Sequence, residues 1–120
     1  MEAGIAPLVE AINAVGIKTV SSCEGHHERP AYVAVASTNG WGAWLVVSGL
    51  RSGLLWENLE DIQVSLEEVP QPEGSPYPSR WVVWLKNFEK MLPGDKVNLA
   101  RSLGEHLTDY VSKRRNPPPE

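Results

Sequence analysis

The sequence predicts an α+β domain in which an N-terminal and a C-terminal helix pack on a mostly antiparallel sheet of about five strands. Three observations support this. Apolar residues recur at helical spacing near both ends of the chain, β-branched segments in between alternate apolar and polar residues, and Gly- and Pro-rich turns separate them. The 120 residues suit one hydrophobic core. We therefore expect a single domain over residues 1–115, followed by a disordered tail over residues 116–120.

The two helices are predicted from apolar stripes and from their end signals. Residues 5, 8, 9, 12 and 15 are apolar, Pro7 suits a first helical turn and Gly16 suits a stop, which together predict a helix over residues 5–15. Near the other end, Pro93-Gly94 makes a turn and Asp95 can cap a helix whose stripe includes Leu99 and Leu103.

The strands are predicted from alternation and β-branching. The five predicted segments are residues 17–23, 31–37, 41–48, 62–67 and 80–87. Thr38-Asn39-Gly40 is a turn signal, so the second and third segments are expected to form a hairpin. A short helix is expected over residues 54–61 and a Pro-rich loop over residues 70–79. Of the five tryptophans, Trp44, Trp81 and Trp84 are expected in the core, whereas Trp41 and Trp56 lie near turns.

The composition gives no sign of a membrane-spanning, secreted or disulfide-bonded protein. No apolar run approaches the ~20 residues of a membrane helix, the first residues lack the pattern of a secretory signal, and a single cysteine cannot form an internal disulfide. We therefore expect a cytoplasmic protein without a membrane partner.

The net charge of −4 is concentrated in one segment. Between Ser52 and Ser79 there is no Lys or Arg, and six carboxylates give that segment a charge of −6. Such a segment repels phosphates and attracts basic surfaces, so direct nucleic-acid binding is disfavoured. The plain alternative is a solvated acidic face. The residues expected to contact a partner are Trp56, Glu57, Glu60 and Asp61.

The densest collection of reactive side chains is Ser21-Ser22-Cys23-Glu24-Gly25-His26-His27, where a predicted strand becomes a loop. Cys23 is a candidate nucleophile with His26 as its base, provided that its pKa is lowered; the alternative is a buried cysteine that acts as a small apolar residue. The loop also offers hydroxyl, amide and cationic donors that could bind a polar ligand. The alternative is that these side chains only form hydrogen bonds with the backbone of their own loop. The expected ligand-binding residues are Ser21, Ser22, Glu24, Gly25, His27 and Arg29.

Metal binding is the third interpretation of this loop. Cys23 and His26 have a C-x-x-H spacing that suits zinc, but no second ligand pair occurs in the chain. We therefore predict no metal site from the sequence, and the cofactor is not determined.

Part of the chain resembles the wybutosine-synthesising tRNA methyltransferase family. The resemblance lies in Ile12-Asn13, in residues 19–26 (Thr-Val-Ser-Ser-Cys-Glu-Gly-His) and in residues 44–48 (Trp-Leu-Val-Val-Ser), within roughly the first 50 residues. That family carries Thr-Ser-Ser-Cys-Ser-Gly-Arg and Trp-Leu-Phe-Val-Ser-His at these places. The resemblance implies a pocket at the matched positions Ser21, Ser22, Cys23 and Gly25.

Three departures from the family pattern limit what the resemblance implies. Glu24 replaces a serine, His26 replaces an arginine and Gly49 replaces a histidine. Replacing an arginine and adding a carboxylate changes an anion-binding loop, so neither methyl transfer nor S-adenosylmethionine is carried over to this chain.

Two functions follow as hypotheses. The first is a small acidic binding protein that engages a basic protein surface or a nucleic-acid-binding complex, for instance as a phage-type inhibitor of a nucleic-acid-handling machine. The second is an enzyme or ligand-binding module related to tRNA-modifying methyltransferases. A purely structural subunit remains a third interpretation.

Overall fold

The structure is a computed structural model that describes residues 2–26, 28–37, 39–59 and 61–114. Within these residues the element order is α1 (Ala6–Ala14), β1 (Lys18–Cys23), β2 (Ala31–Ala36), α2 (Trp41–Trp56), β3 (Gln63–Pro70), β4 (Ser79–Lys86), a 3-10 turn (Phe88–Lys90) and α3 (Pro93–Ser112). The four strands form one antiparallel sheet in the order β1-β2-β4-β3. The predicted α+β class is confirmed, with four strands where about five were expected and three α-helices where two were expected to pack on the sheet.

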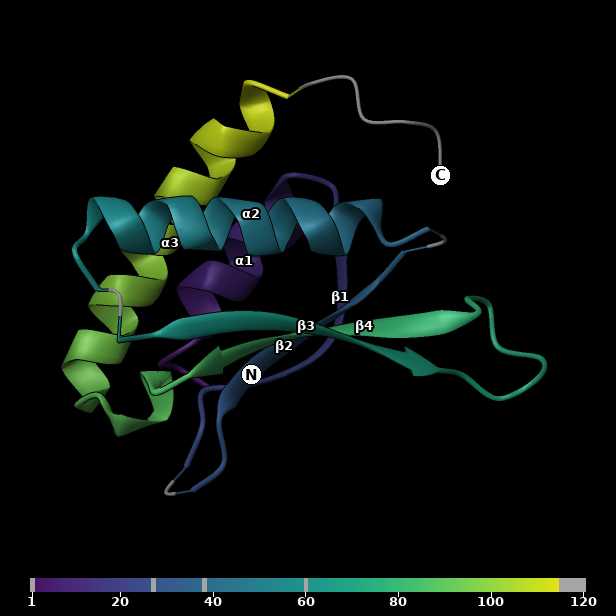
Figure 1. Cartoon of the computed structure of the whole chain (residues 1–120), viewed down its shortest axis with the longest axis horizontal. Coiled ribbons are helices and arrows are strands. Elements are labelled where there is room, and N and C mark those ends of the chain that lie inside the picture. Colours follow the sequence, from purple (N-terminus) through teal and green to yellow (C-terminus); the bar gives the residue numbers. More distant parts are fainter. Residues whose placement is uncertain (1, 27, 38, 60, 115–120) are drawn as a thin grey trace.

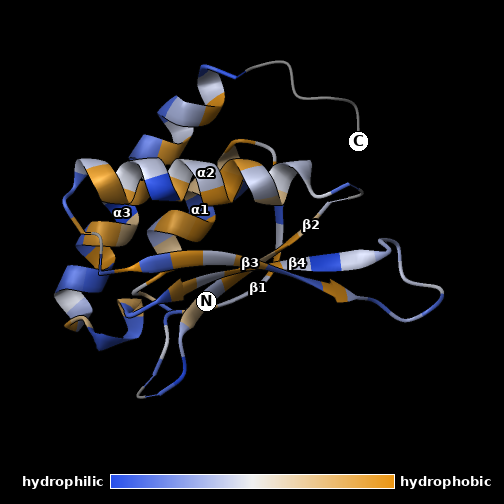
Figure 2. Cartoon of the chain, viewed as in Figure 1, coloured by the Kyte–Doolittle hydropathy of each residue, from blue (hydrophilic) through white to orange (hydrophobic). Residues whose placement is uncertain are grey.

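The helices gather on one side of the sheet (Figure 1). Helix α3 packs against both α1 and α2, and α2 packs over β3 and β4. The core between the layers is built from alternate residues of the central strands, such as Val33 and Val83, and from helix residues such as Ile12, Leu50 and Leu103. In Figure 2, apolar residues recur along the three helices and in the strands beneath them. This alternation is why β2 and β4 were predictable as strands.

The other face of the sheet carries no helix among the described residues. Tyr32 and Trp84 pair across β2 and β4 on that face, with ring centroids 5.4 Å apart. Ala34 and Val82, which lie next to them in the register, are buried without belonging to the main core. Strand β4 lies between β2 and β3, and Trp84 is half-buried on this second face.

The predicted strand over residues 41–48 is wrong, because these residues begin α2. Gly40 precedes the helix with φ of +77°, and a Cβ there would lie 2.9 Å from the Trp81 ring, so the predicted hairpin turn is instead a helix start. The Asn39 side chain accepts a hydrogen bond from the Trp41 backbone N–H at 3.0 Å. The short helix predicted over 54–61 is correct only for the last residues of α2, which ends at Trp56.

Tertiary packing explains why α2 forms despite its β-branched and aromatic residues. A Cβ on Gly49 would lie 2.5 Å from a Leu107 methyl group, and a Cβ on Gly53 would lie 3.0 Å from one on Leu103. The two glycines therefore let α3 approach α2 closely, and this contact outweighs local propensity. Trp44, expected in the core, is 48% exposed on the outer side of α2.

The remaining boundaries differ by small amounts. The last helix begins at Pro93, two residues before the predicted cap, and Asp95 lies in its first turn. Strand β3 continues to Pro70, and the loop is closed by a hydrogen bond from the Gln71 N–H to the Pro78 carbonyl. The expected tail over 116–120 lies outside the described residues. No helix in the described part of the chain is long and apolar enough to cross a bilayer.

Candidate functional sites

The loop after β1 is held by a hydrogen-bonded turn and by a glycine. The backbone groups of His26 and Arg29 bond to each other in both directions, at 3.2 and 2.8 Å. Gly25 has φ of +85°, and a Cβ at this position would lie 2.5 Å from the Glu89 Cβ and 2.9 Å from the Ala31 nitrogen. A side chain at position 25 is therefore excluded both by conformation and by space.

Glu24 points into the protein and not into a ligand pocket. Its carboxylate accepts hydrogen bonds from the Gly4 N–H at 3.3 Å and from the Lys96 ammonium at 3.4 Å. Lys96 also donates to the Gly25 carbonyl at 3.1 Å, and its side chain is only 7% exposed. Lys96 therefore ties the start of α3 to this loop, and Glu24 is a structural anion in this arrangement.

Cys23, His26 and a residue that sequence reasoning missed, Glu2, come together at the solvent side of the loop. One side-chain donor atom from each lies within 4.8 Å of the other two. The Glu2 carboxylate contacts the His26 Nε2, and its Oε1 accepts a hydrogen bond from the Glu24 N–H at 3.1 Å. The Cys23 sulfur accepts one from the Gly25 N–H at 3.4 Å.

The surroundings of Cys23 raise the pKa of its thiol, whereas a cysteine nucleophile requires a lowered pKa. Burial raises the pKa of the Cys23 thiol, and the hydrogen bond to Glu2 and the negative charges of Glu2 and Glu24 raise it further, against the opposing effect of the Gly25 N–H. Conversely, the hydrogen bond from Cys23 lowers the pKa of Glu2, and His26 contributes in the same direction. At neutral pH the sulfur is thus a thiol beside a carboxylate.

The other predicted ligand-binding residues are divided between the two sides of the sheet. Ser22 pairs with Val33, so it faces the helices, whereas Ser21 pairs with Ala34 and faces the same side as Cys23, which pairs with Tyr32. The Ser21 hydroxyl is buried and has no hydrogen-bond partner among the described residues. Arg29 is exposed and is engaged through its backbone. His27 lies outside the described residues.

The predicted partner-binding residues lie at the C-terminal end of α2. Trp56 is 80% exposed and the adjacent Leu55 is 63% exposed. Glu57 accepts a hydrogen bond from the Ser102 hydroxyl of α3, and Asp61 is exposed, with its backbone carbonyl bonded to the Asn87 side chain at 2.7 Å. Glu60 lies outside the described residues.

At the other end of α2 lies an aromatic hollow of about 420 Å³. Trp41 and Trp44 stack along its wall with ring centroids 5.4 Å apart and an interplanar angle of 16°. Leu66 of β3 and Trp81 of β4 complete the wall, together with Asn39 and Gly40. The sequence suggested tryptophans near turns but not this hollow, because it forms only when residues 41–48 are helical.

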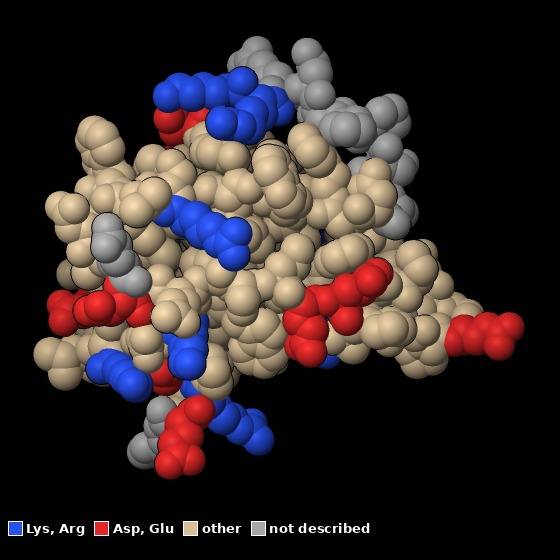
Figure 3. Space-filling model, viewed as in Figure 1, with Lys and Arg blue, Asp and Glu red and all other residues tan. Residues whose placement is uncertain are grey.

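Arg51 fixes α2 to the edge of the sheet between these two ends. Its guanidinium donates to the Val64 carbonyl of β3 from Nε at 3.3 Å and from a terminal nitrogen at 2.9 Å. Strand β3 is an edge strand whose exposed side chains include Glu67 and Glu68. We call the exposed surface made by Trp44, Leu55, Trp56, Glu57, Asp61, Leu66 and Glu68 the α2–β3 face; Glu67 points to the other side of the sheet, where it accepts a hydrogen bond from the Trp84 ring nitrogen. Figure 3 shows acidic groups at the left and at the centre-right of the viewed side, with one basic side chain between them and further basic side chains at the lower left.

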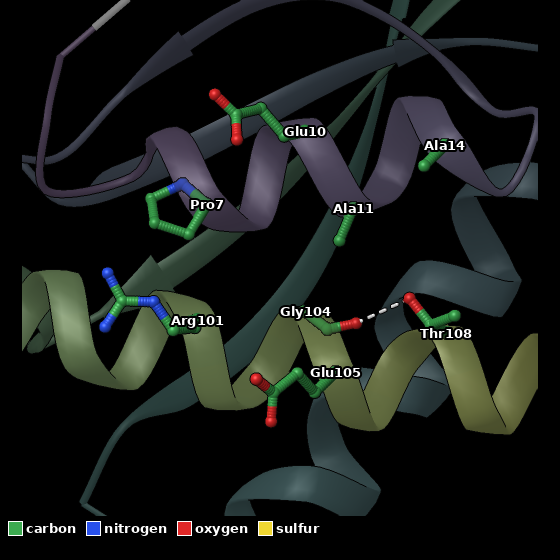
Figure 4. Close-up of a pocket in the computed structure, with 8 residues that line it drawn as sticks. All are labelled: Pro7, Glu10, Ala11, Ala14, Arg101, Gly104, Glu105 and Thr108. Atoms are coloured by element: carbon green, nitrogen blue, oxygen red, sulfur yellow. Dashed lines mark hydrogen bonds between the residues drawn. The ribbon is translucent and has the colours of Figure 1, made fainter.

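A second groove of about 420 Å³ lies between α1 and α3 (Figure 4). Its floor is made of small residues, including Ala11 of α1 and Gly104 of α3. The two helices approach closely there, since a Cβ on Gly104 would lie 2.9 Å from the Ala11 Cβ. Glu10, Arg101 and Glu105 stand at its rim. Close approach of two helices at small residues accounts for this groove.

His106, at the border of the stripe on α3, lies against α2. Its Nε2 is 3.1 Å from the Ser52 hydroxyl. It therefore belongs to the helix interface.

Comparison with known proteins gives no family assignment: no family model, no curated protein and no solved structure matches this chain.

Proposed function

We propose that this protein is an interaction module that binds a basic macromolecular surface through its α2–β3 face. The observation that carries the proposal is the exposure of three large apolar side chains on one helix, Trp44, Leu55 and Trp56, whose opposite side is buried in the core. Tryptophan is enriched among the residues that dominate binding energy at interfaces. Trp44 and Trp56 are about 18 Å apart along the helix axis, which suits an interface of ordinary size.

The charge around these apolar residues supports a basic partner. Apart from Trp44, the α2–β3 face lies within the segment that carries six carboxylates and no Lys or Arg, and Arg51, which precedes this segment, is bonded to the Val64 carbonyl. Opposite charges across an interface speed encounter and favour the correct partner over others. Surfaces that bind nucleic acids are typically basic, so the partner class that fits best is a nucleic-acid-binding protein. Occupying such a surface would inhibit the partner by competing with its nucleic acid.

The aromatic hollow adds a chemical reason for arginine or lysine on the partner. Glu68 lies opposite Trp81 in the β3–β4 register, and Leu66 on the same side of β3 lines the hollow. A cationic side chain that enters a hollow walled by indole rings gains cation–π attraction, and a carboxylate at its edge adds a charge-assisted hydrogen bond. Arg51 holds β3 in place, so the hollow is preformed.

A pull-down from the native cells, with bound proteins identified by mass spectrometry, tests the proposal. The wild type should retain a basic protein that is lost with W56A and with the double variant Glu57→Lys/Asp61→Lys. The matched control is Glu10→Lys/Glu105→Lys, which makes the same change in charge at the α1–α3 groove and should retain the partner. Equal capture by all variants would contradict the proposed face.

The alternative function, a ligand-binding module or enzyme related to tRNA-modifying methyltransferases, draws its support from the Cys23 motif and from the convergence of Glu2, Cys23 and His26. Calorimetric titration with S-adenosylmethionine separates the two functions. Saturable binding that is lost in Cys23→Ala would favour the alternative, and the interaction module predicts no such binding.

A further inference from the structure

Glu2, Cys23 and His26 supply a carboxylate, a thiol and an imidazole from three separate places: the residues before α1, the end of β1 and the loop that follows it. We propose that these three side chains bind one divalent cation of the zinc type. This inference is independent of the α2–β3 face.

The spacing of the donor atoms fits a single ion. Zinc bonds to sulfur at ~2.3 Å and to nitrogen or oxygen at ~2.0–2.2 Å, so tetrahedral ligands lie roughly 3–4 Å from one another. In the structure the three donor atoms lie within 4.8 Å of each other. Small rotations of exposed side chains close this difference, because the His26 side chain is 56% exposed and that of Glu2 is 35% exposed.

The surrounding backbone already orients the donors. The Gly25 N–H points at the Cys23 sulfur, which stabilises a metal-bound thiolate. The Glu24 N–H holds Oε1 of Glu2, leaving Oε2 beside the imidazole for the ion. The paired backbone bonds between His26 and Arg29 fix the loop that carries the imidazole. Such outer hydrogen bonds are characteristic of functional metal sites.

Charge and donor type select the ion. Because Lys96 balances the Glu24 carboxylate, the Glu2 carboxylate is the charge that remains beside the thiol, and it favours a cation there. One sulfur, one nitrogen and one oxygen suit Zn²⁺ or Co²⁺ better than Mg²⁺ or Ca²⁺, which prefer oxygen ligands only. Three protein ligands leave a fourth position open to water, as in zinc sites that react with ligands.

Sequence reasoning considered Cys23 and His26 as ligands and lacked the third. Glu2 is separated from them by more than 20 positions, and only the packing of α1 beside β1 brings it to the loop. The test is therefore whether Glu2, which no metal-binding pattern includes, contributes to affinity.

Titration of the untagged, chelator-stripped protein with Co²⁺ tests the site directly. The expected result is one equivalent of bound Co²⁺, a thiolate-to-cobalt charge-transfer absorption in the near ultraviolet, and displacement of the ion by Zn²⁺. Cys23→Ser should abolish that absorption. His26→Gln and E2Q should each weaken binding by at least ~10-fold.

The control variant is His106→Gln, which removes the imidazole at the α2–α3 interface and should leave cobalt binding unchanged. Circular dichroism confirms that each variant is folded. Because Glu2 is a partly exposed side chain outside the helices and strands, E2Q keeps the test decisive even if Cys23→Ser unfolds. Absence of the charge-transfer band in the wild type, or equal affinity in E2Q and wild type, would overturn the proposal.

Discussion

The α2–β3 face and the loop after β1 differ in how their chemical groups are used within the fold. On the α2–β3 face, the large side chains of Leu55 and Trp56 are mostly exposed, although burial of each would be worth about 1.5–3 kcal/mol. In the loop, Glu24 and Gly25 are tied down by Lys96, and only the solvent side presents groups to a ligand. The first region therefore has large apolar side chains that no other part of the described protein covers, whereas the second is fixed by hydrogen bonds from Lys96. This contrast is why we propose macromolecular binding at the first region and cation binding at the second.

The largest expected effect comes from breaking the frame of the loop. Lys96→Ala removes the cation from a nearly buried pair and leaves the Glu24 carboxylate and the Gly25 carbonyl without their donor. We expect the free energy of unfolding to fall by about 3 kcal/mol or more, as for other buried pairs that lose one partner. Urea denaturation measures this change.

The matched control is Lys90→Ala, which alters an exposed lysine and should change stability by less than about 0.5 kcal/mol. Replacing both partners of the buried pair, as Glu24→Gln/Lys96→Met, should recover part of the loss. An equal effect of Lys96→Ala and Lys90→Ala would show that the loop has no such frame.

The next expected change in stability comes from a substitution on the side of α2 that packs against α3. Gly49→Ala places a methyl group against Leu107, which is fully buried, and should destabilise the protein by about 1–3 kcal/mol. Gly94→Ala, in the first turn of α3, meets no atom within 4 Å and should be neutral or stabilising by up to about 1 kcal/mol. Thermal melts of the two variants give the comparison. If both shift equally, the close contact of α2 with α3 is not what makes residues 41–56 helical.

A smaller effect concerns the thiol. In the presence of a chelator, alkylation of Cys23 should reach its half-maximal rate above the ordinary thiol pKa of about 8.5, because burial and the two carboxylates raise the pKa of Cys23. E2Q removes one charge and one hydrogen-bond acceptor, so the thiol pKa should fall and the rate profile should move to lower pH. A profile that moves to higher pH, or does not move, would contradict the role of Glu2.

The smallest expected effect on stability is on the outer side of α2. The double variant Leu55→Ala/Trp56→Ala should change the free energy of unfolding by less than about 1 kcal/mol, since both side chains are largely solvated. Leu50→Ala, on the buried side of the same helix, should cost about 2–5 kcal/mol. A large loss for the outer pair would mean that these residues serve the fold and not a partner.

Much of the fold was predictable because local pattern and final environment agree. Helix α1 and strands β2, β3 and β4 lie close to their predicted ranges, since each carries apolar residues toward the core and, in β2 and β4, on both sides. Edge strand β1 also lies close to its predicted range, although none of its residues is fully buried, because its β-branched residues favour a strand. Residues 41–48 were misassigned because tryptophan and valine favour strands, while the glycines that permit contact with α3 are informative only once α3 is in place.

The candidate sites were predictable only in part. Cys23 and His26 stand close together in the sequence, so their association was visible, whereas Glu2 and Lys96 reach the loop through tertiary packing that no spacing rule indicates. Ser21 and Ser22 were grouped as ligands, but neighbouring strand residues point to opposite faces of a sheet, and the register separates them. The exposure of Trp56 was consistent with its position near a turn, and the hollow beside Trp44 depended on the helix that was missed.

Photo-crosslinking in the native cells tests the central claim, that the α2–β3 face binds a basic partner, most directly. A photoreactive phenylalanine analogue in place of Leu55, which leaves Trp56 intact, should yield one dominant cross-linked species that contains a basic protein, and the same analogue in place of Glu105 should not. Cross-links to the same species from both positions, or none from position 55, would contradict the account.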